Sequence, residues 1–230
     1  MDAPHSLLSL RVTGLGSGSG ARVETRDLVV VGGSAGSLAP LRTLASALPA
    51  NLPASILVSM HMGDRAESRL PWLLSRSGPL PAAHAKAGER LQAGRVYVAP
   101  PGFHLTVPDG IVELSDGPRV NGSRPAIDVM FGSAARSFGA RVVAVVLSGL
   151  LYDGAVGAAQ VAQAGGLVVV QEPEEAAQPS MPRAAMAAAP GAMGVPEMRL
   201  GEVITGMLGE AGLATWPRPE RPTNVGCLAS

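Results

Sequence analysis

The chain has 230 residues, of which 47% are hydrophobic, and its 18 Lys and Arg residues balance its 18 Asp and Glu residues. This length and apolar content suffice for one domain with a sizeable core, and the zero net charge excludes steering onto nucleic acid or an anionic membrane by bulk charge. No apolar stretch approaches the roughly 20 residues that a membrane helix needs, and the amino terminus lacks the features of a signal peptide. The single cysteine, Cys227, cannot form an internal disulfide. We therefore expect a cytoplasmic protein without membrane insertion and without a nucleic-acid partner.

The amino-terminal part of the chain predicts a flexible leader followed by a buried strand. The run GLGSGSG, residues 14–20, cannot pack, and residues 1–26 are the expected leader. The all-apolar run Leu28–Val31 ends in two glycines, a pattern typical of a strand buried on both faces of a parallel sheet. The next predicted elements are a helix over 37–47, a strand over 55–60 and a helix over 70–77.

The segment from Pro79 to Leu114 changes its hydrophobic period from about 3.6 to 2. Turns are predicted at Pro100-Pro101-Gly102 and Pro108-Asp109-Gly110, between short strands. We expect this segment to form a small antiparallel excursion from the main fold.

The second half of the chain returns to alternating helices and strands. The predicted elements are helices over 127–138, 154–164 and 203–210, and strands over 141–147 and 167–171. Such alternation implies right-handed crossovers and a mostly parallel sheet with helices on both faces. The sequence therefore predicts one doubly wound α/β domain over residues 27–214, followed by a flexible tail over 215–230.

The strongest local signal is VVVGGSAGS, residues 29–37, a glycine-rich turn between a strand and a helix. It exposes Ser34 at the carboxyl edge of the sheet, where α/β proteins place their sites. Gly32, Gly33 and Gly36 do not fit the spacing of a dinucleotide site, and the lysine of a P-loop is absent. Ser34 is thus either a helix N-cap or a nucleophile.

His61 and Asp153 decide between these alternatives. Each follows an apolar strand, so in a parallel sheet both lie on the same edge as Ser34. Alone, each has a plainer explanation, as a surface or capping residue. Together they predict that Ser34 attacks an ester, His61 transfers its proton, and Asp153 orients the imidazole. The order Ser, His, Asp along the chain differs from the three familiar hydrolase orders.

Two further residues are candidates for a substrate cleft. His104 follows a turn in APPGFHL, where a solvated hairpin position is the alternative. Arg124, in SRPAIDVMF, is a candidate anchor for a substrate carboxylate, although Ser123-Arg124-Pro125 equally resembles the entry of a helix. No His, Cys or Asp cluster has metal-ligand spacing, so we expect neither a metal nor another cofactor.

Several ordered motifs resemble one known family, the catalytic domain of the chemoreceptor protein-glutamate methylesterases of the CheB type. The resemblance covers about residues 27–190 and rests on VVVGGSAGS, LVSMHM, VYVAPPGFHL, SRPAIDVMF, VVAVVLSGLLYDGA and QEPEEAAQPSMPRAAM. It implies a doubly wound α/β domain that removes methyl groups from glutamate methyl esters on receptor helices. Matched motif by motif, the family's serine, histidine and aspartate correspond to Ser34, His61 and Asp153. A methylated chemoreceptor or a similar coiled-coil protein is the implied partner, and deamidation of related glutamine side chains is a second implied activity.

The chain departs from the family pattern near the proposed nucleophile. Ala35 stands where the family usually has threonine, and Leu150 stands at the family's methionine position, whose backbone amide is implied in oxyanion binding. Leu151 replaces a glycine, which removes easy access to positive φ and predicts a reshaped loop. These changes leave two alternatives open: an interaction module with weakened catalysis, or a small-molecule carboxylesterase. Because residues before Asp27 are too few for the family's receiver domain, we expect either constitutive activity or control by a separate receiver protein.

Overall fold

The computed structural model describes residues 25–61 and 68–208. All but the last two residues of the expected leader, and the whole of the expected tail, lie outside the described residues. The domain boundaries at residues 26 and 214 therefore stay predictions. Within the described ranges, no helix combines the length and the apolar character needed to cross a membrane.

The described chain is built around a seven-stranded sheet in the order β3-β4-β2-β1-β7-β8-β9. Its strands are β1 (Leu28–Gly33), β2 (Ser55–Met60), β3 (Ala82–His84), β4 (Val96–Val98), β7 (Val142–Val146), β8 (Leu167–Gln171) and β9 (Met193–Val195). Every neighbouring pair in this sheet is parallel. The chain first builds outward from β1 through β2 and then, from β7, in the opposite direction. The carboxyl ends of β1 and β7 therefore form a topological switch point, where α/β folds open a crevice.

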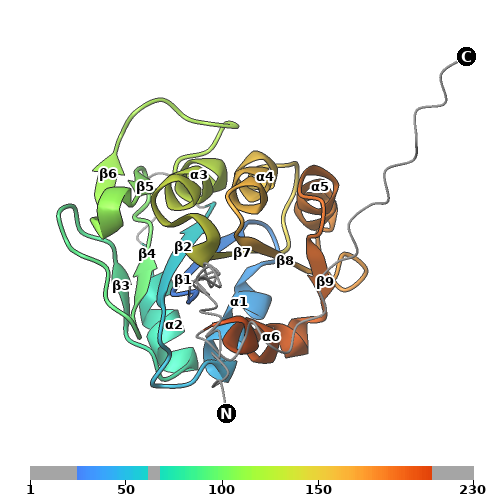
Figure 1. The fold of residues 1–230 in the computed structure, drawn as a ribbon, viewed down its shortest axis with the longest axis horizontal. Coiled ribbons are helices and arrows are strands. Elements are labelled where there is room, and N and C mark those ends of the chain that lie inside the picture. Colours follow the sequence, from blue (N-terminus) through green and yellow to red (C-terminus); the bar gives the residue numbers. More distant parts are fainter. Residues whose placement is uncertain (1–24, 62–67, 209–230) are drawn as a thin grey trace, which may run out of the picture.

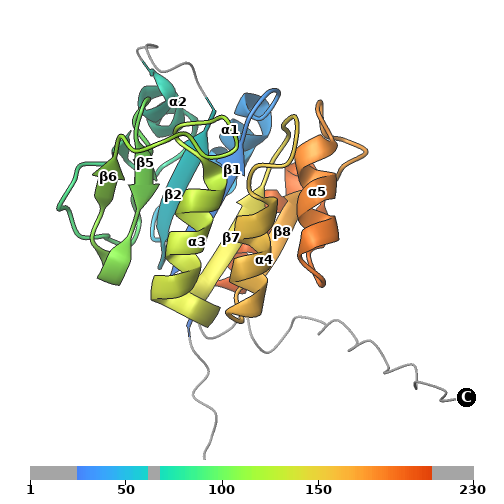
Figure 2. The ribbon, with the colours of Figure 1, turned by 90° about the horizontal axis from the view of Figure 1, so that it is seen from above.

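Helices cover both faces of the sheet (Figures 1 and 2). One face carries α1 (Leu38–Ala47), α2 (Leu70–Ser77) and α6 (Leu200–Met207); the other carries α3 (Ile127–Phe138), α4 (Ala155–Gln163) and α5 (Ser180–Ala188). A second, two-stranded antiparallel sheet, β5 (His104–Thr106) with β6 (Glu113–Ser115), lies beside α3. The predicted doubly wound α/β fold is confirmed.

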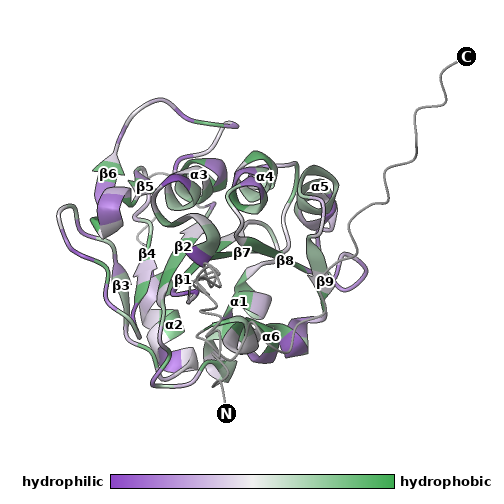
Figure 3. Cartoon of the chain, viewed as in Figure 1, coloured by the Kyte–Doolittle hydropathy of each residue, from purple (hydrophilic) through white to green (hydrophobic). Residues whose placement is uncertain are grey.

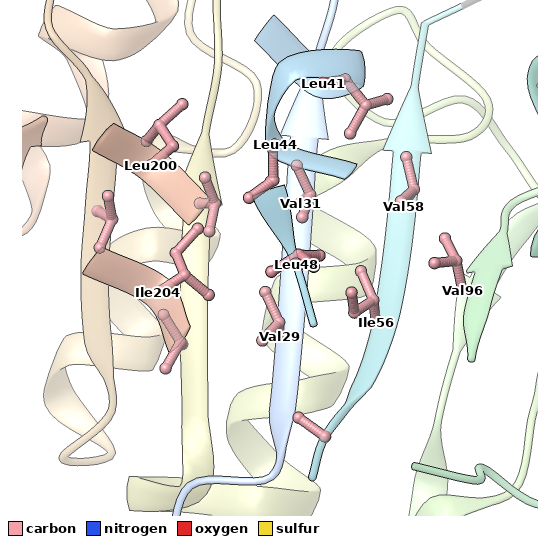
Figure 4. Close-up of a cluster of buried hydrophobic side chains, with 14 of the residues drawn as sticks. Val29, Val31, Leu41, Leu44, Leu48, Ile56, Val58, Val96, Leu200 and Ile204 are labelled. Atoms are coloured by element: carbon pink, nitrogen blue, oxygen red, sulfur yellow. The ribbon is translucent and has the colours of Figure 1, made fainter. Parts of the chain in front are cut away.

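The alternation of side chains along β1 supplies both halves of the core. Val29 and Val31 point to the layer of α1 and α6, as Figure 4 shows, and Leu28 and Val30 point to the layer of α3. In Figure 3, hydrophobic colour covers the central strands β7 and β8. Each of these four β1 side chains is almost completely buried, and burying one contributes about 1.5–3 kcal/mol to the stability of the fold. The core thus holds β1, and the turn that follows it, from both sides.

Several predicted elements have the expected bounds, while one segment was partly wrong. The elements over 55–60, 127–138 and 167–171 are confirmed to the residue, and the helix expected around 70–77 is confirmed. Between Pro79 and Leu114, β5 pairs with β6 in antiparallel register and Arg90 forms an isolated antiparallel bridge with Ile111, whereas β3 and β4 join the main sheet in parallel register. These strands have three residues each, too few to reveal a partner. Helix α5 and strand β9 were not predicted, because their segments offer few large apolar residues.

Candidate active site

A tight turn after β1 holds Ser34 at the carboxyl edge of the sheet. The Ser34 amide donates to the Ser148 carbonyl oxygen at 3.0 Å, and the Ser34 carbonyl oxygen accepts from the Ser37 hydroxyl at 2.6 Å. Gly36 adopts φ +80°, and a Cβ there would lie 2.7 Å from Ser148 Oγ. The sequence Ser-Ala-Gly-Ser therefore satisfies both the backbone conformation and the close approach of the neighbouring loop.

The register of β1 and β2 brings His61 beside Ser34. Gly33 pairs with Met60 in the parallel ladder, so the residues that follow them leave the sheet side by side. The His61 amide donates to the Gly33 carbonyl oxygen at 3.2 Å, and His61 Nδ1 lies 3.2 Å from Ser34 Oγ. The imidazole is thus within hydrogen-bond reach of the serine hydroxyl.

Asp153 completes the arrangement from the loop between β7 and α4. Its Oδ2 lies 2.7 Å from His61 Nε2, and its side chain is only 3% exposed, against 20% for His61. Oδ2 also accepts from the Ile127 amide at 2.8 Å, while Oδ1 accepts from Asn121 Nδ2 at 2.9 Å and from the Asp128 amide at 3.1 Å. The carboxylate is therefore held from three other parts of the chain. The predicted meeting of the three side chains at one sheet edge is observed, and their catalytic roles stay a prediction.

The charge of Asp153 sets the tautomer of His61. Burial raises the pKa of Asp153, but the hydrogen bonds from His61, Ile127, Asn121 and Asp128 outweigh burial and hold that pKa below its ordinary value. An ionised carboxylate only accepts, so the hydrogen between Asp153 Oδ2 and the imidazole belongs to Nε2. Nδ1 then carries the lone pair that faces Ser34 Oγ. The two ring nitrogens exchange the roles they have in the chymotrypsin triad.

A hollow of about 100 Å³ opens beside Ser34. The residues that line it are Ser34, His61, Asn121, Ser123, Leu150, Leu151, Tyr152 and Asp153. Three of these, which we call the apolar rim, are Leu150, Leu151 and Tyr152, with exposed fractions of 50%, 69% and 56%. Leu151 adopts φ +65°. The expectation that leucine would not reach positive φ here is therefore wrong. Leu151 adopts a conformation that glycine would adopt without strain.

Of the two candidate oxyanion residues, Ala35 lies in the turn that holds Ser34, and Leu150 lies in the loop beside it. Leu150 lines the hollow, while Ala35 directly follows Ser34 and its carbonyl oxygen accepts from Ser148 Oγ at 2.8 Å. Gly149 brings the Leu150 loop close, since a Cβ there would lie 3.0 Å from Ser34 Cβ. Both backbones thus approach the serine, and their role in binding an oxyanion stays a prediction.

The side chains of His104 and Arg124, the two candidates for a substrate cleft, are hydrogen-bonded to backbone groups. His104 is 5% exposed, and its ring bonds the Pro118 carbonyl oxygen at 2.9 Å and the Ala126 amide at 3.2 Å. Arg124 Nη1 donates to the carbonyl oxygens of Asp116 and, at 2.8 Å, Gly117. Neither side chain lines the hollow. Backbone groups of the loop after β6 thus hold both side chains, and their expected place in a substrate cleft stays a prediction.

Two residues of the site, Asn121 and Asp128, were missed. Asn121 Nδ2 donates to both carboxylates, at 2.9 Å to Asp153 Oδ1 and at 2.7 Å to Asp128 Oδ2. Asp128 Oδ1 accepts from the Gly157 amide of α4 at 2.7 Å. The dipeptide Asn121-Gly122 is a turn signal, but nothing local in the sequence indicates where its side chain points.

A larger hollow, about 520 Å³, lies at the opposite edge of the sheet. Asp27, Ser55 and Arg141 line it at the amino ends of β1, β2 and β7. Arg141 Nε donates to Asp27 Oδ1 at 2.9 Å, so these two charges offset each other. In the described ranges, no three His, Cys, Asp or Glu side chains gather as a metal site would require. We therefore base the function on the smaller hollow beside Ser34.

The fold and the site define a class of protein: a doubly wound α/β domain with a Ser-His-Asp chain of hydrogen bonds at its topological switch point. Residues 29–204 match the model of the CheB methylesterase family, and the chain belongs to that family.

Solved and curated relatives agree with this assignment. The crystal structure of the Thermotoga maritima CheB methylesterase catalytic domain superposes with a TM-score of 0.74 at 30% identity, covering 80% of this chain and 100% of that one. A protein-glutamate methylesterase/protein-glutamine glutaminase of Symbiobacterium thermophilum is 36% identical over 84% of this chain and 54% of its own length. The protein-glutamate methylesterase/protein-glutamine glutaminase 3 of Anaeromyxobacter dehalogenans is 43% identical over 70% of this chain and 48% of its own length. The chain thus spans about half the length of these curated relatives.

Proposed function

We propose that this protein is a serine hydrolase that removes methyl esters from glutamate side chains of chemoreceptor-like proteins in chemotaxis-type signalling. Deamidation of related glutamine side chains is part of the same proposal, since the curated relatives are named for both activities. The observation that carries the proposal is the hydrogen-bonded chain from Ser34 Oγ through His61 to Asp153. It lies in a chain that belongs to the methylesterase family.

The geometry supports an acyl-enzyme mechanism. Ser34 Oγ attacks the ester carbonyl carbon while His61 Nδ1 takes the hydroxyl proton, and Asp153 stabilises the resulting imidazolium through Nε2. When the tetrahedral intermediate collapses, the bond to the methoxy oxygen breaks and that oxygen takes the proton from His61 as methanol leaves. A water then repeats the sequence against the Ser34 ester, which frees the glutamate carboxylate. With a glutamine side chain, ammonia leaves in place of methanol.

The oxyanion of each intermediate needs donors beside Ser34. The backbone amides of Ala35 and Leu150 are the proposed donors, because both belong to segments that close on the serine. Removing one such donor costs about 3 kcal/mol of transition-state stabilisation in a serine hydrolase. A backbone donor keeps its role whatever side chain it carries, so leucine at position 150 is compatible with activity.

The size of the hollow favours a small ester over a bulky one. A volume of about 100 Å³ is small beside the roughly 300–1,000 Å³ of typical ligand pockets. This accommodates an ester group and its methyl, and leaves the rest of the substrate outside, against the apolar rim. A glutamyl side chain that projects from a helix of a coiled-coil receptor has this shape.

The setting and control of the reaction belong to the proposal as well. We place the protein in the cytoplasm, which the single cysteine supports because it leaves no pair for an internal disulfide. A separate receiver protein is the proposed regulator.

Methanol release tests the proposed activity. The substrate is a receptor fragment that carries glutamate methyl esters, and the matched variants are Ser34→Ala and Ser46→Ala, an exposed serine on α1. We expect release by the wild type and by Ser46→Ala, and none above background by Ser34→Ala. Equal release by Ser34→Ala would remove Ser34 from the mechanism.

A panel of simple esters separates the two alternatives. A small-molecule carboxylesterase would turn over soluble methyl or acetyl esters faster than the receptor fragment. An interaction module would bind the fragment and hydrolyse none of these substrates. The intact chain of hydrogen bonds among the three side chains favours catalysis over binding alone.

A further inference from the structure

A short turn before α3 presents one amide group to two carboxylates. Val120 and Ser123 pair across this turn, with N–O distances of 3.1 and 2.9 Å, and the two residues between them have positive φ, 52° at Asn121 and 76° at Gly122. An Asn-Gly pair with positive φ at both positions is the preference of a type I′ turn, so the sequence suits the backbone. The turn therefore holds the Asn121 side chain in a fixed direction.

That direction is into the site. Asn121 Nδ2 lies 2.9 Å from Asp153 Oδ1 and 2.7 Å from Asp128 Oδ2, so the two hydrogens of one amide group serve two acidic side chains. Asp128 in turn fixes the start of α4 through the Gly157 amide. The amide thus links the turn, α3 and the loop that carries Asp153.

The two carboxylates need such a donor, because they repel each other. Burial raises the pKa of Asp128, and the nearby charge of Asp153 raises it further, while Asn121 lowers it. The titratable side chains acting on Asp153 are His61, from the end of β2, and Asp128, from α3. The adjoining helix α4 contains none. Asn121 is the side-chain donor that both acidic groups share.

We propose that Asn121 is a positioning residue for the reaction: its amide bridges Asp128 and Asp153, keeps the Asp153 carboxylate turned toward His61, and offsets the repulsion between the two acids. This inference rests on the proposed function, because it assigns Asn121 to the same Ser34–His61 chemistry. Without the bridge, Oδ1 of Asp153 keeps only the Asp128 amide as a donor, and the carboxylate is freer to rotate away from Nε2. Activation of Ser34 then weakens although Ser34, His61 and Asp153 are all present.

The Asn121 side-chain amide can be removed without changing the backbone of the turn. Asn121→Gly removes the amide and tolerates positive φ, so the turn keeps its backbone. Asn121→Asp keeps the shape and the turn type but replaces the donor by an oxygen that repels both carboxylates. Asn51→Gly, at an exposed position outside the site, is the matched control for an asparagine-to-glycine change.

The experiment measures the rate at which a fluorophosphonate labels Ser34 between pH 5 and 9, together with methanol release from a methyl-esterified receptor fragment. We expect Asn121→Gly to label about 10–100-fold more slowly than wild type, as the loss of a hydrogen bond to a charged group would give. Its acidic limb should shift to lower pH, because an imidazolium from which the Asp153 carboxylate has turned away is less stable. KM for the fragment should stay within about threefold. Asn121→Asp should lose more at neutral pH, and Asn51→Gly should match the wild type.

The outcomes separate this inference from the proposed function. Wild-type rates and an unchanged acidic limb in both Asn121 variants would overturn the positioning role while leaving methylesterase activity intact. A slower rate with no shift of the acidic limb in either variant would overturn it too, because a loosened loop alone has that effect. Absence of labelling in the wild type would refute the proposed function, and the positioning role with it. If Asn121→Gly fails to fold, the Asn121→Asp variant alone decides between these results.

Discussion

Replacing Asp153 by asparagine changes few atoms, but it turns one of the two hydrogen-bond acceptors of this side chain into a donor. The carboxylate accepts on both oxygens, from His61 and the Ile127 amide on one and from Asn121 and the Asp128 amide on the other. An asparagine has one acceptor and one donor group, so one of the two sides must meet an NH₂ group.

The expected loss of activity follows from the tautomer. If the new NH₂ faces His61, Nε2 must accept, and the imidazole hydrogen moves to Nδ1, where it points at Ser34 Oγ. The base that should take the serine proton is then absent. In a serine protease the equivalent substitution lowers kcat about 10⁴-fold, which is about 5 kcal/mol at 1.36 kcal/mol per tenfold. We expect Asp153→Asn to lower kcat by about 10³–10⁴-fold.

Stability should fall by a smaller amount. If the NH₂ faces Asn121 and the Asp128 amide instead, two donors lose their acceptor, at about 1–3 kcal/mol each, while repulsion from Asp128 disappears. We expect a net loss of about 2 kcal/mol at pH 7. The folded pKa of Asp153 lies below its unfolded value, so the stability from its ionisation is complete above the unfolded pKa, about 3.9, and is lost as the pH falls through the folded pKa. The stability difference between wild type and variant should therefore close below about pH 4.

Two assays check this prediction, with Asp109→Asn in a surface turn as the matched control. Methanol release gives kcat, and urea unfolding at pH 7 and at pH 3.5 gives the free energies of unfolding. A variant that keeps more than about a tenth of wild-type kcat would refute the assigned tautomer. A stability difference that grows toward low pH would refute the assigned charge of Asp153.

Three further changes test the loop that follows β7. Leu151→Gly should raise the free energy of unfolding by about 0.5 kcal/mol, because relief of positive-φ strain exceeds the entropy of glycine and little burial is lost; a loss above about 1 kcal/mol in urea unfolding would contradict the strain. Gly149→Ala should cost about 1–3 kcal/mol and lower kcat at least tenfold, since the new methyl would lie 2.0 Å from Met181 Sδ and 3.0 Å from Ser34 Cβ; unchanged thermal unfolding and methanol release would show that the contact is not tight. Tyr152→Ser should raise KM for the receptor fragment about 3–10-fold without changing fluorophosphonate labelling, because it removes part of the apolar rim; an unchanged KM would exclude Tyr152 from substrate binding.

The parts of the fold that could be predicted are those in which burial alone dictates the pattern. β2 and α3 were predicted to the residue, because an all-apolar run or a stripe at helical spacing needs no knowledge of its partners. The β3 and β4 strands have three residues each. β4 belongs to the main sheet through its pairing with β2, which lies earlier in the chain, and β3 through its pairing with β4. Such pairing is a property of the whole fold.

The same division applies to the site. The proximity of Ser34, His61 and Asp153 could be predicted, because parallel strands end at one edge of a sheet and each residue lies just after such a strand or in the loop that follows it. Asn121 could not, because it reaches Asp153 from a hairpin turn whose direction is set by contacts with α3. The hydrogen bonds of His104 could not be predicted for the same reason, since its two backbone partners come from the loop after β6.

The central claim is that His61 makes the Ser34 hydroxyl nucleophilic, and site mapping of a fluorophosphonate adduct tests it most directly. After brief exposure at pH 7.5, intact-mass and peptide mass spectrometry of the full chain should find one adduct, on the peptide that contains Ser34. The adduct should be absent from Ser34→Ala and reduced by at least 10²-fold in rate in His61→Ala. An adduct on another residue, or equal labelling of Ser34 in His61→Ala, would contradict the claim.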